Sequence, residues 1–218
     1  MTERLRVAVL ASGGGTNLQA LLDHATSAWD VTLVLSDRAD AGALDRADRA
    51  GIAHEVVVTG PGKAGETAAQ MLDALDRHDI GAIVLAGYLK LVPKGVVAAY
   101  ADRIINIHPA LLPSFGGKGM YGIHVHRAVL EAGVRVTGVT VHLVDEAYDR
   151  GRIIAQRPVP VLAGDSPETV AARVLEVEHS LYPRVVDHLT AAWRAGRDPE
   201  PMDDPGDVYR LASSNTRV

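Results

Sequence analysis

Short apolar runs alternate with longer amphipathic segments through the first half of the chain. Leu5–Ala11 is an apolar run that leads into glycines, a pattern typical of a buried strand, and Asn17–Ala28 then carries apolar residues at helical spacing. Such alternation predicts right-handed crossovers and a mostly parallel sheet. Further strands are predicted at Val31–Leu35, His54–Val58, Ile80–Ala86 and Arg103–Ile107, and further helices at Ala43–Gly51, Gly65–His78 and Pro93–Tyr100.

The second half of the chain has a different pattern. A long loop rich in Gly and Pro, Pro109–Gly122, precedes a predicted helix at His124–Ala132. Two strand patterns then follow in succession, Val134–Val144 and Gly151–Val161, before a long helix at Asp165–Arg194. Successive strands favour antiparallel pairing. The predicted fold is therefore α/β and Rossmann-like, a mostly parallel sheet with helices on both faces and antiparallel pairing in the C-terminal part.

Composition narrows the class of protein. Hydrophobic residues make up 47% of the 218 residues, which favours one packed domain, expected over residues 1–195. Residues 196–218 are polar with three prolines and are expected to form a loosely attached tail. The chain has no cysteine, so disulfides and thiolate catalysis are excluded. A net charge of -5 argues against a general nucleic-acid binder. With no signal peptide or membrane span in the sequence, a cytoplasmic protein is expected.

The glycine loop after the first strand, residues 11–17, is a candidate anion site. Its backbone N–H groups and the following helix N-terminus suit a phosphate, although a tight strand-to-helix turn also favours glycine. The third glycine of a dinucleotide fingerprint is replaced by Leu18. Asp37, which follows the second strand, still leaves a nicotinamide-dependent oxidoreductase as an alternative.

Three polar residues form a candidate catalytic group. Asn106 and His108 are two apart at the carboxyl end of a predicted parallel strand, so their side chains should project to the same side. Together they could hold a carbonyl and stabilise negative charge on its oxygen, or they could be a turn cap and a structural histidine. Asp149 could face His108 and relay a proton, or simply belong to an Asp-Arg-Gly turn.

The pair His124 and His126 does not indicate a metal site. Residues two apart in the expected helix lie on different faces, and no carboxylate follows at zinc-site spacing. No metal is therefore expected.

Several segments together resemble the glycinamide ribonucleotide formyltransferase family, in order and at about its spacing. The resemblance covers Leu5–Leu189, and its NIHPALLP segment is specific to folate-dependent formyltransferases and their relatives. The segments are ASGGGTNLQA (11–20), LAGY (85–88), NIHPALLP (106–113), GVTVH (138–142), DRG (149–151) and EH (178–179).

This resemblance implies transfer of a formyl group from 10-formyltetrahydrofolate to the amine of the nucleotide, in purine synthesis. It implies a nucleotide-binding half at about residues 1–107 and a folate and catalytic half at about 108–195. The implied catalytic residues are Asn106, His108 and Asp149, supported by His142. The implied substrate-binding residues are Gly15, Thr16 and Asn17 for the phosphate and Glu178 for the glycinamide part; Leu89, Lys90, Leu91, Val92 and Asn106 would contact the folate.

Some positions depart from the family. Lys90 stands where arginine is frequent, and the region of Lys63 to Glu66 lacks the usual arginine, so Lys63 is the candidate substitute. The loop at Gly116–Gly122 is longer than in the shortest members. The rivals within the family are a formyltetrahydrofolate deformylase and methionyl-tRNA formyltransferase, which usually carry further domains. The expected partners are small molecules, and the expected state is a monomer or homodimer.

Overall fold

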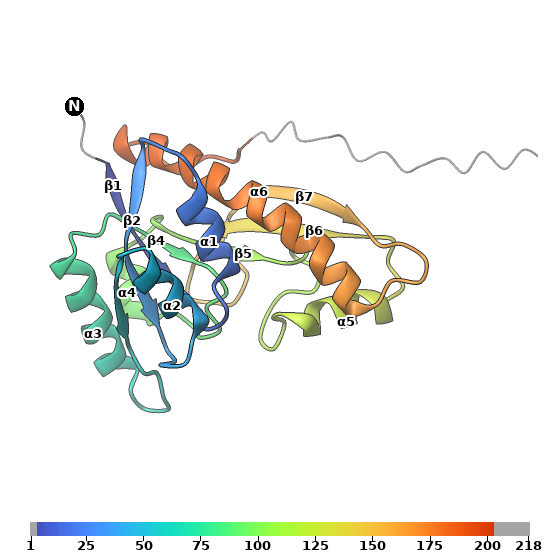
Figure 1. The fold of residues 1–218 in the computed structure, drawn as a ribbon, viewed down its shortest axis with the longest axis horizontal. Coiled ribbons are helices and arrows are strands. Elements are labelled where there is room, and N and C mark those ends of the chain that lie inside the picture. Colours follow the sequence, from blue (N-terminus) through green and yellow to red (C-terminus); the bar gives the residue numbers. More distant parts are fainter. Residues whose placement is uncertain (1–3, 203–218) are drawn as a thin grey trace, which may run out of the picture.

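The computed structural model describes residues 4–202, which form a seven-stranded sheet in the order β3-β2-β1-β4-β5-β6-β7. Figure 1 shows the sheet with helices on both faces. The strands are β1 Leu5–Leu10, β2 Trp29–Ser36, β3 Ala53–Val56, β4 Ala82–Leu85, β5 Ile104–His108, β6 Val136–Leu143 and β7 Ile153–Pro160. The helices are α1 Thr16–Asp23, α2 Gly42–Arg49, α3 Ala64–Arg77, α4 Lys94–Ala99, α5 Ile123–Glu131 and α6 Pro167–Arg194.

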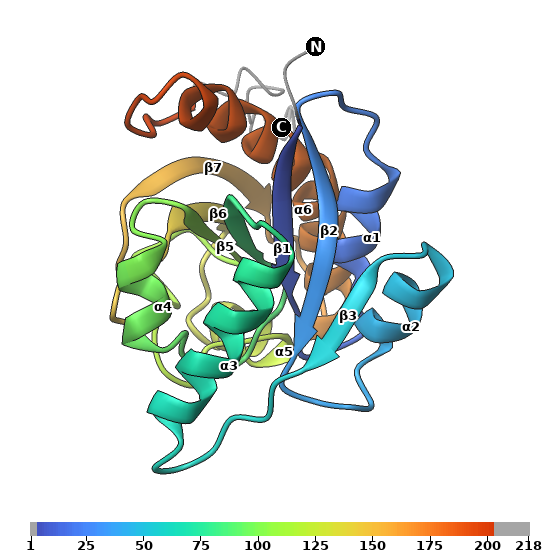
Figure 2. The same cartoon turned by 90° about the vertical axis from the view of Figure 1, so that its left-hand side faces the viewer.

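The central strands β1 and β4 are apolar at successive positions, so the sheet is buried on both faces there. In β1, Val7 and Val9 pack into one core, whereas Ala8 and Leu10 pack into the other. This division follows from the two-residue period of a strand. Helices α1, α2, α5 and α6 supply side chains to the first core, and α3 and α4 supply them to the second. Figure 2 shows these two groups of helices around the sheet.

The pairing of the strands confirms the predicted mixed sheet. Strands β1 to β5 pair in parallel, while β5–β6 and β6–β7 are antiparallel. The antiparallel register sets Asn106 opposite His142 and His108 opposite Thr140. The side chains of Asn106 and His142, from different parts of the sequence, therefore meet on neighbouring strands.

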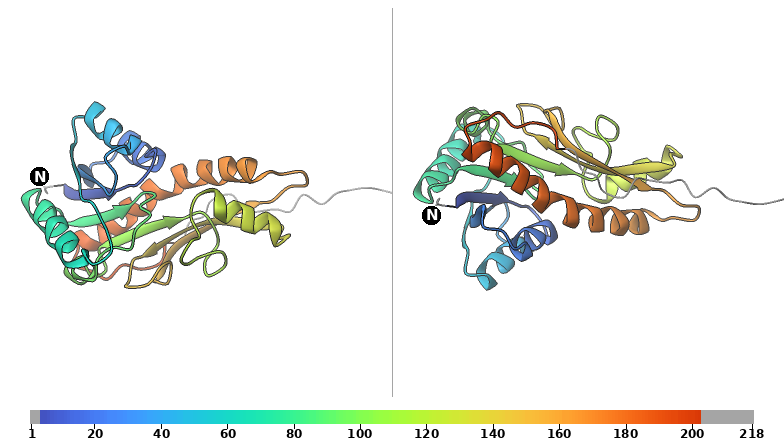
Figure 3. Two further views of the ribbon diagram at one scale, coloured as in Figure 1. Left: turned by 90° about the horizontal axis from the view of Figure 1, so that it is seen from below. Right: turned by 90° about the horizontal axis from the view of Figure 1, so that it is seen from above.

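Helix α6 connects the two halves of the sheet. It begins at a Ser166 N-cap with a capping box and runs along the molecule, as Figure 3 shows. In its middle, the fully buried Tyr182 donates from its hydroxyl to Leu85 O at 2.8 Å and to Ile105 O at 3.3 Å. Glu178 lies one turn earlier on the same helix, so this anchor also fixes Glu178 beside the ends of β4 and β5.

The structure corrects some predicted boundaries. Helix α1 ends at Asp23 rather than Ala28, and Pro93 is the extended N-cap residue of α4 rather than part of its first turn. The first part of the predicted tail is not loosely attached, because the Met202 N–H donates to Ile154 O at 2.7 Å. The rest of the tail, 203–218, lies outside the described residues. Within residues 4–202, no helix combines the length and apolar character that crossing a membrane requires.

Candidate active site

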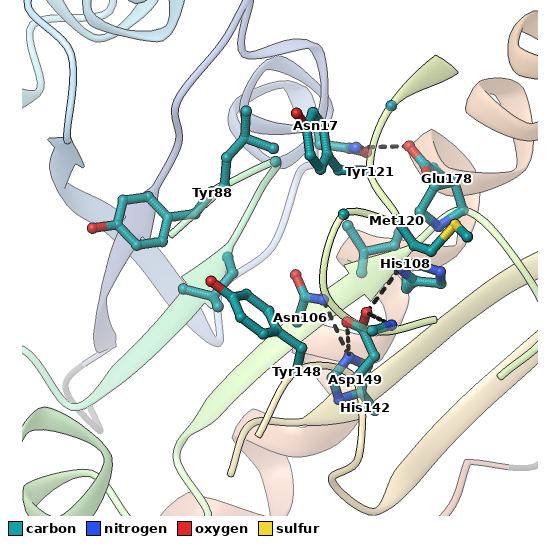
Figure 4. Close-up of a pocket in the computed structure, with 18 of the residues that line it drawn as sticks. Asn17, Tyr88, Asn106, His108, Met120, Tyr121, His142, Tyr148, Asp149 and Glu178 are labelled. Atoms are coloured by element: carbon teal, nitrogen blue, oxygen red, sulfur yellow. Dashed lines mark hydrogen bonds and ion pairs between the residues drawn. The ribbon is translucent and has the colours of Figure 1, made fainter. Parts of the chain in front are cut away.

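A cavity of about 810 Å³ opens at the carboxyl ends of β4 and β5. Asn106, His108, His142 and Asp149 all line it, and Figure 4 shows Asp149 between the two histidines. The structure thus brings together all four residues that the sequence predicts for the catalytic centre. Their arrangement follows from the β5–β6 register and from the loop between β6 and β7, which carries Asp149 back to the strand ends.

His142 orients the amide of Asn106. The Nδ1 of His142 donates to Leu143 O at 2.7 Å, so in the neutral ring Nε2 carries the lone pair. The Nδ2 group of Asn106 lies 3.1 Å from that Nε2 and donates to it. The second N–H of the Asn106 amide remains available to a ligand in the cavity, which makes Asn106 a hydrogen-bond donor of fixed direction.

His108 and Asp149 form a buried acid–base pair. His108 donates from Nε2 to Phe115 O at 2.9 Å, which leaves Nδ1 as the proton acceptor of the neutral ring. Nδ1 lies 3.7 Å from Oδ2 of Asp149, and Oδ1 of Asp149 lies 3.6 Å from Nε2 of His142. Since the Gly117 N–H also donates to Oδ2 at 2.8 Å, the carboxylate is held in place from two sides.

The charges of this pair follow from burial and hydrogen bonding. Burial lowers the pKa of His108, and Asp149 and the Phe115 carbonyl oppose this only in part. Burial alone would raise the pKa of Asp149, but His142, the Gly117 N–H and the charge of His108 outweigh it, and the pKa falls below its ordinary value. The resting site near neutral pH is therefore a neutral imidazole beside an ionised carboxylate.

The backbone around Asp149 is constrained. Asp149 has φ 53°, in the left-handed region that few non-glycine residues adopt. Two residues later, a Cβ on Gly151 would come within 1.8 Å of the Leu143 carbonyl oxygen on β6, so only glycine fits. This close approach fixes the turn that presents Asp149, and backbone strain of this kind is frequent at functional sites.

A second polar pair lies on the wall formed by α1 and α6. Asn17 donates from Nδ2 to Oε2 of Glu178 at 2.8 Å, and Figure 4 shows this pair apart from the catalytic group. Burial raises the pKa of Glu178 to about 7, although the Asn17 hydrogen bond opposes the shift. Within residues 4–202, Oδ1 of Asn17 is buried without a hydrogen-bond partner. This wall can therefore accept hydrogen bonds from a polar ligand.

Replacing Glu178 by Gln should stabilise the ligand-free protein at alkaline pH. The wild-type carboxyl is protonated in both states below its unfolded pKa of 4.5, and its contribution to stability is lost as the pH rises through about 7 in the folded state. Glutamine stays neutral at every pH. The free energy of unfolding of Glu178→Gln, minus that of wild type, should therefore increase by up to about 3 kcal/mol between about pH 4.5 and pH 8. Urea unfolding at several pH values measures this difference. A difference independent of pH would contradict it.

The N-terminal glycine loop, residues 11–17, lies beside the cavity. Thr16 and Asn17 line the cavity, but Gly15 does not. Gly15 has φ 72°, and a Cβ there would lie 2.7 Å from Cα of Ala43 on α2, so its glycine is required by close packing. The Arg46 side chain of α2 also donates to Gly14 O at 2.7 Å, which helps to hold the loop in place. The loop is thus both a packed turn and a wall of the cavity.

Of the residues predicted to contact the folate, the segment Leu89–Val92 lies at the cavity and Lys63 does not. Leu89, Lys90, Leu91 and Val92 all line the cavity, with the two leucines each 41% exposed at its rim. Lys63 is the exposed N-cap residue of α3 and is not among the lining residues. The structure therefore brings the first four residues to the site but not Lys63.

Sequence reasoning missed several cavity residues from the β5–α5 loop, residues 109–122, and from α5. His126 is buried at 4% exposure, whereas His124 is exposed, which confirms that the two face different ways. Among residues 4–202, no group of His, Asp and Glu is arranged to hold a metal ion. The burial of His126 could have been inferred from its position next to Val125, at the edge of the apolar face of the helix. Other lining residues that were missed include Lys118, Met120 and Tyr121 of the β5–α5 loop and Tyr148 of the β6–β7 loop.

Comparison with known proteins agrees with the motifs. Phosphoribosylglycinamide formyltransferase of Arabidopsis thaliana, a chloroplastic protein, is 45% identical over 190 residues, which are 84% of this chain and 64% of the relative. The phosphoribosylglycinamide formyltransferase of Escherichia coli is 36% identical over 88% of this chain and 95% of its own length. The chain thus spans less than two thirds of the plant relative but nearly all of the bacterial one.

Solved structures show the same fold. Glycinamide ribonucleotide transformylase 1 from Symbiobacterium toebii has a TM-score of 0.80 and 39% identity, covering 88% of this chain and 90% of that one. A formyltetrahydrofolate deformylase from Pseudomonas syringae has a TM-score of 0.78 at 27% identity, covering 87% of this chain and 62% of that one. The protein-family model described as "Formyl transferase" matches residues 5–186 of this chain. The resemblance inferred from the motifs is confirmed, and the chain belongs to the formyl transferase family.

Proposed function

We propose that this chain transfers the formyl group of 10-formyltetrahydrofolate to the amine of 5′-phosphoribosylglycinamide, a step of purine synthesis. The observation that carries the proposal is the group of Asn106, His108 and Asp149 in one cavity with the Asn17–Glu178 pair. At about 810 Å³ the cavity is near the upper end of small-molecule sites, as a site for two substrates requires. The names and lengths of the bacterial relatives support the same substrate pair.

The proposed reaction follows from the resting protonation of the site. The amine attacks the formyl carbon, and the free N–H of Asn106 donates to the oxygen as it becomes negative. The proton released by the amine moves to Nδ1 of His108, where the imidazolium faces the Asp149 carboxylate at 3.7 Å. Nδ1–H then stabilises the oxyanion and passes its proton to the folate nitrogen as the carbon–nitrogen bond breaks. The formyl group is transferred without a covalent enzyme intermediate.

The two ends of the cavity suit the two substrates. The nucleotide phosphate is assigned to residues 15–17, and its glycinamide part to the Asn17–Glu178 wall. The folate is assigned to the apolar rim of Leu89–Val92, with Lys90 as the cation for its carboxylates. The proposal includes a cytoplasmic site of action and a monomer or homodimer.

Phosphate-free glycinamide riboside should bind much more weakly than the nucleotide. The loop at residues 15–17 offers backbone N–H groups and the start of α1 to an anion, and a charge-assisted hydrogen bond contributes about 1.5–3 kcal/mol. We therefore expect a loss of at least about tenfold in affinity by calorimetry. Equal affinity of riboside and nucleotide would mean that this loop serves only as a turn.

Deformylation of a stable 10-formyl folate analogue, followed by absorbance, tests the proposed function. The purified chain is mixed with the analogue in the presence and absence of 5′-phosphoribosylglycinamide. Signal that depends on the nucleotide supports transfer. Signal without the nucleotide indicates a deformylase, the function of the more distant structural relative. Absence of signal in both mixtures contradicts the proposal and favours the nicotinamide alternative, which nicotinamide fluorescence would then test.

A further inference from the structure

His126 is a buried polar side chain that the proposed chemistry does not use. It is 4% exposed, it lines the cavity, and its Nδ1 is buried without a hydrogen-bond partner in the described part of the chain. A buried polar atom without a partner costs about 1–3 kcal/mol, so the fold holds this ring in the cavity wall at a cost to stability. Because Nδ1 is sealed by protein, Nε2 is the ring nitrogen that a ligand in the cavity can reach.

His126 lies in the same cavity as the catalytic group, on a helix that packs against α6. His126 is close enough to His108 for the two rings to interact electrostatically. Helix α5, which carries it, packs against α6, the helix of Glu178. Figure 1 shows α5 beside α6 and away from α3 and α4. A substrate group that touches His126 therefore lies near His108 and on the side of the cavity that α5 and α6 form.

We propose that His126 is a further substrate-binding residue, which hydrogen-bonds the glycinamide arm of the nucleotide and holds it beside His108. This inference rests on the proposed function. The phosphate is the less suitable partner, because the proposed phosphate loop is at the start of α1, whereas His126 neighbours the catalytic histidine. The folate is also less suitable, because the rim assigned to it, Leu89–Val92, follows β4 and not α5 or α6.

The electrostatic surroundings favour an uncharged partner. Burial lowers the pKa of His126, and the neighbouring His108 lowers it further, so the ring is neutral near pH 7. A neutral imidazole offers one donor and one acceptor, which match an amide or a free amine better than a dianionic phosphate. The charged and titratable groups that line the same cavity are Lys118 of the β5–α5 loop, His108 of β5, His142 of β6, Tyr148 and Asp149 of the β6–β7 loop, Glu178 of α6, Tyr121, and Tyr88 and Lys90 after β4.

Calorimetry with two ligands tests the inference. Wild type and His126→Leu are titrated with 5′-phosphoribosylglycinamide and with ribose 5-phosphate, which keeps the sugar and phosphate but lacks the arm. His126→Leu should bind the glycinamide nucleotide about tenfold more weakly and ribose 5-phosphate unchanged. Since leucine leaves no unpaired polar atom in the buried site, the variant should fold. His126→Gln, which can place a polar atom near the position of Nε2, should recover most of the affinity.

His124→Leu is the matched control, on the same helix but exposed, and it should bind both ligands as wild type does. Equal weakening of both ligands by His126→Leu would overturn the inference, since the change would then act on the whole cavity. Unchanged binding of the glycinamide nucleotide would overturn it too. If wild type itself does not bind that nucleotide, the proposed function fails together with the inference, which separates this case from the other two.

Discussion

Replacing Asp149 by Asn is expected to lower turnover about 10³-fold while the protein folds normally. The variant removes the negative charge that lies 3.7 Å from Nδ1 of His108 and stabilises the imidazolium formed when the amine loses its proton. An asparagine oxygen can still accept from the Gly117 N–H, and asparagine tolerates the φ of 53° at this position. The loss should therefore appear in kcat rather than in the stability of the fold.

Steady-state kinetics with both substrates measures this effect, and thermal unfolding checks the fold. Glu146→Gln is the matched control, because Glu146 is on the same β6–β7 loop but is exposed and pairs only with Lys94 among residues 4–202. Its kcat should stay within about twofold of wild type, as expected for loss of an exposed ion pair. An Asp149→Asn enzyme with near wild-type kcat would remove Asp149 from the mechanism.

Replacing Asn106 by Ala is expected to lower kcat by about 10²–10³-fold, the usual cost of losing one oxyanion donor. The amide is held at 3.1 Å from Nε2 of His142, so its second N–H has a fixed direction before substrate binds. A donor that acts mainly as the oxygen becomes charged should change kcat much more than KM.

The kinetics of Asn106→Ala distinguish two roles for the residue. A rise in KM for the folate with unchanged kcat would mean that Asn106 only binds the ground-state substrate. In that case the oxyanion would have to be stabilised by His108 without Asn106. The double variant Asn106→Ala, Asp149→Asn should lose less than the product of the two single losses if both residues act through the same transition state.

The fold was largely predictable from the periodicity of the apolar residues. The runs that became β1 and β4 are apolar at successive positions because helices cover both faces, and this pattern predicts a parallel sheet. Helix ends were less predictable, since α1 stops at Asp23 although the following residues continue an amphipathic pattern. The early end lets residues 24–28 turn into β2.

The candidate site was predictable only in part from local patterns. The two-residue spacing of Asn106 and His108 predicts that their side chains project to the same side. This prediction succeeds because both residues are on one strand. The meeting of His142 and Asp149 with them depends on the antiparallel register of β6 and on a turn that only Gly151 permits, and the family resemblance supplied it. The burial of His126 has only the weak local signal of its apolar neighbour Val125. The distance of Lys63 from the cavity depends on how α3 packs, which no local pattern encodes.

Movement of a formyl group from folate to nucleotide can be measured by following the formyl carbon itself. The purified chain is incubated with 10-formyltetrahydrofolate carrying ¹³C in the formyl group and with 5′-phosphoribosylglycinamide, and the products are separated by mass spectrometry. The label is expected in the formylated nucleotide. Label found in free formate, with the nucleotide unchanged, would contradict it and identify hydrolysis as the reaction.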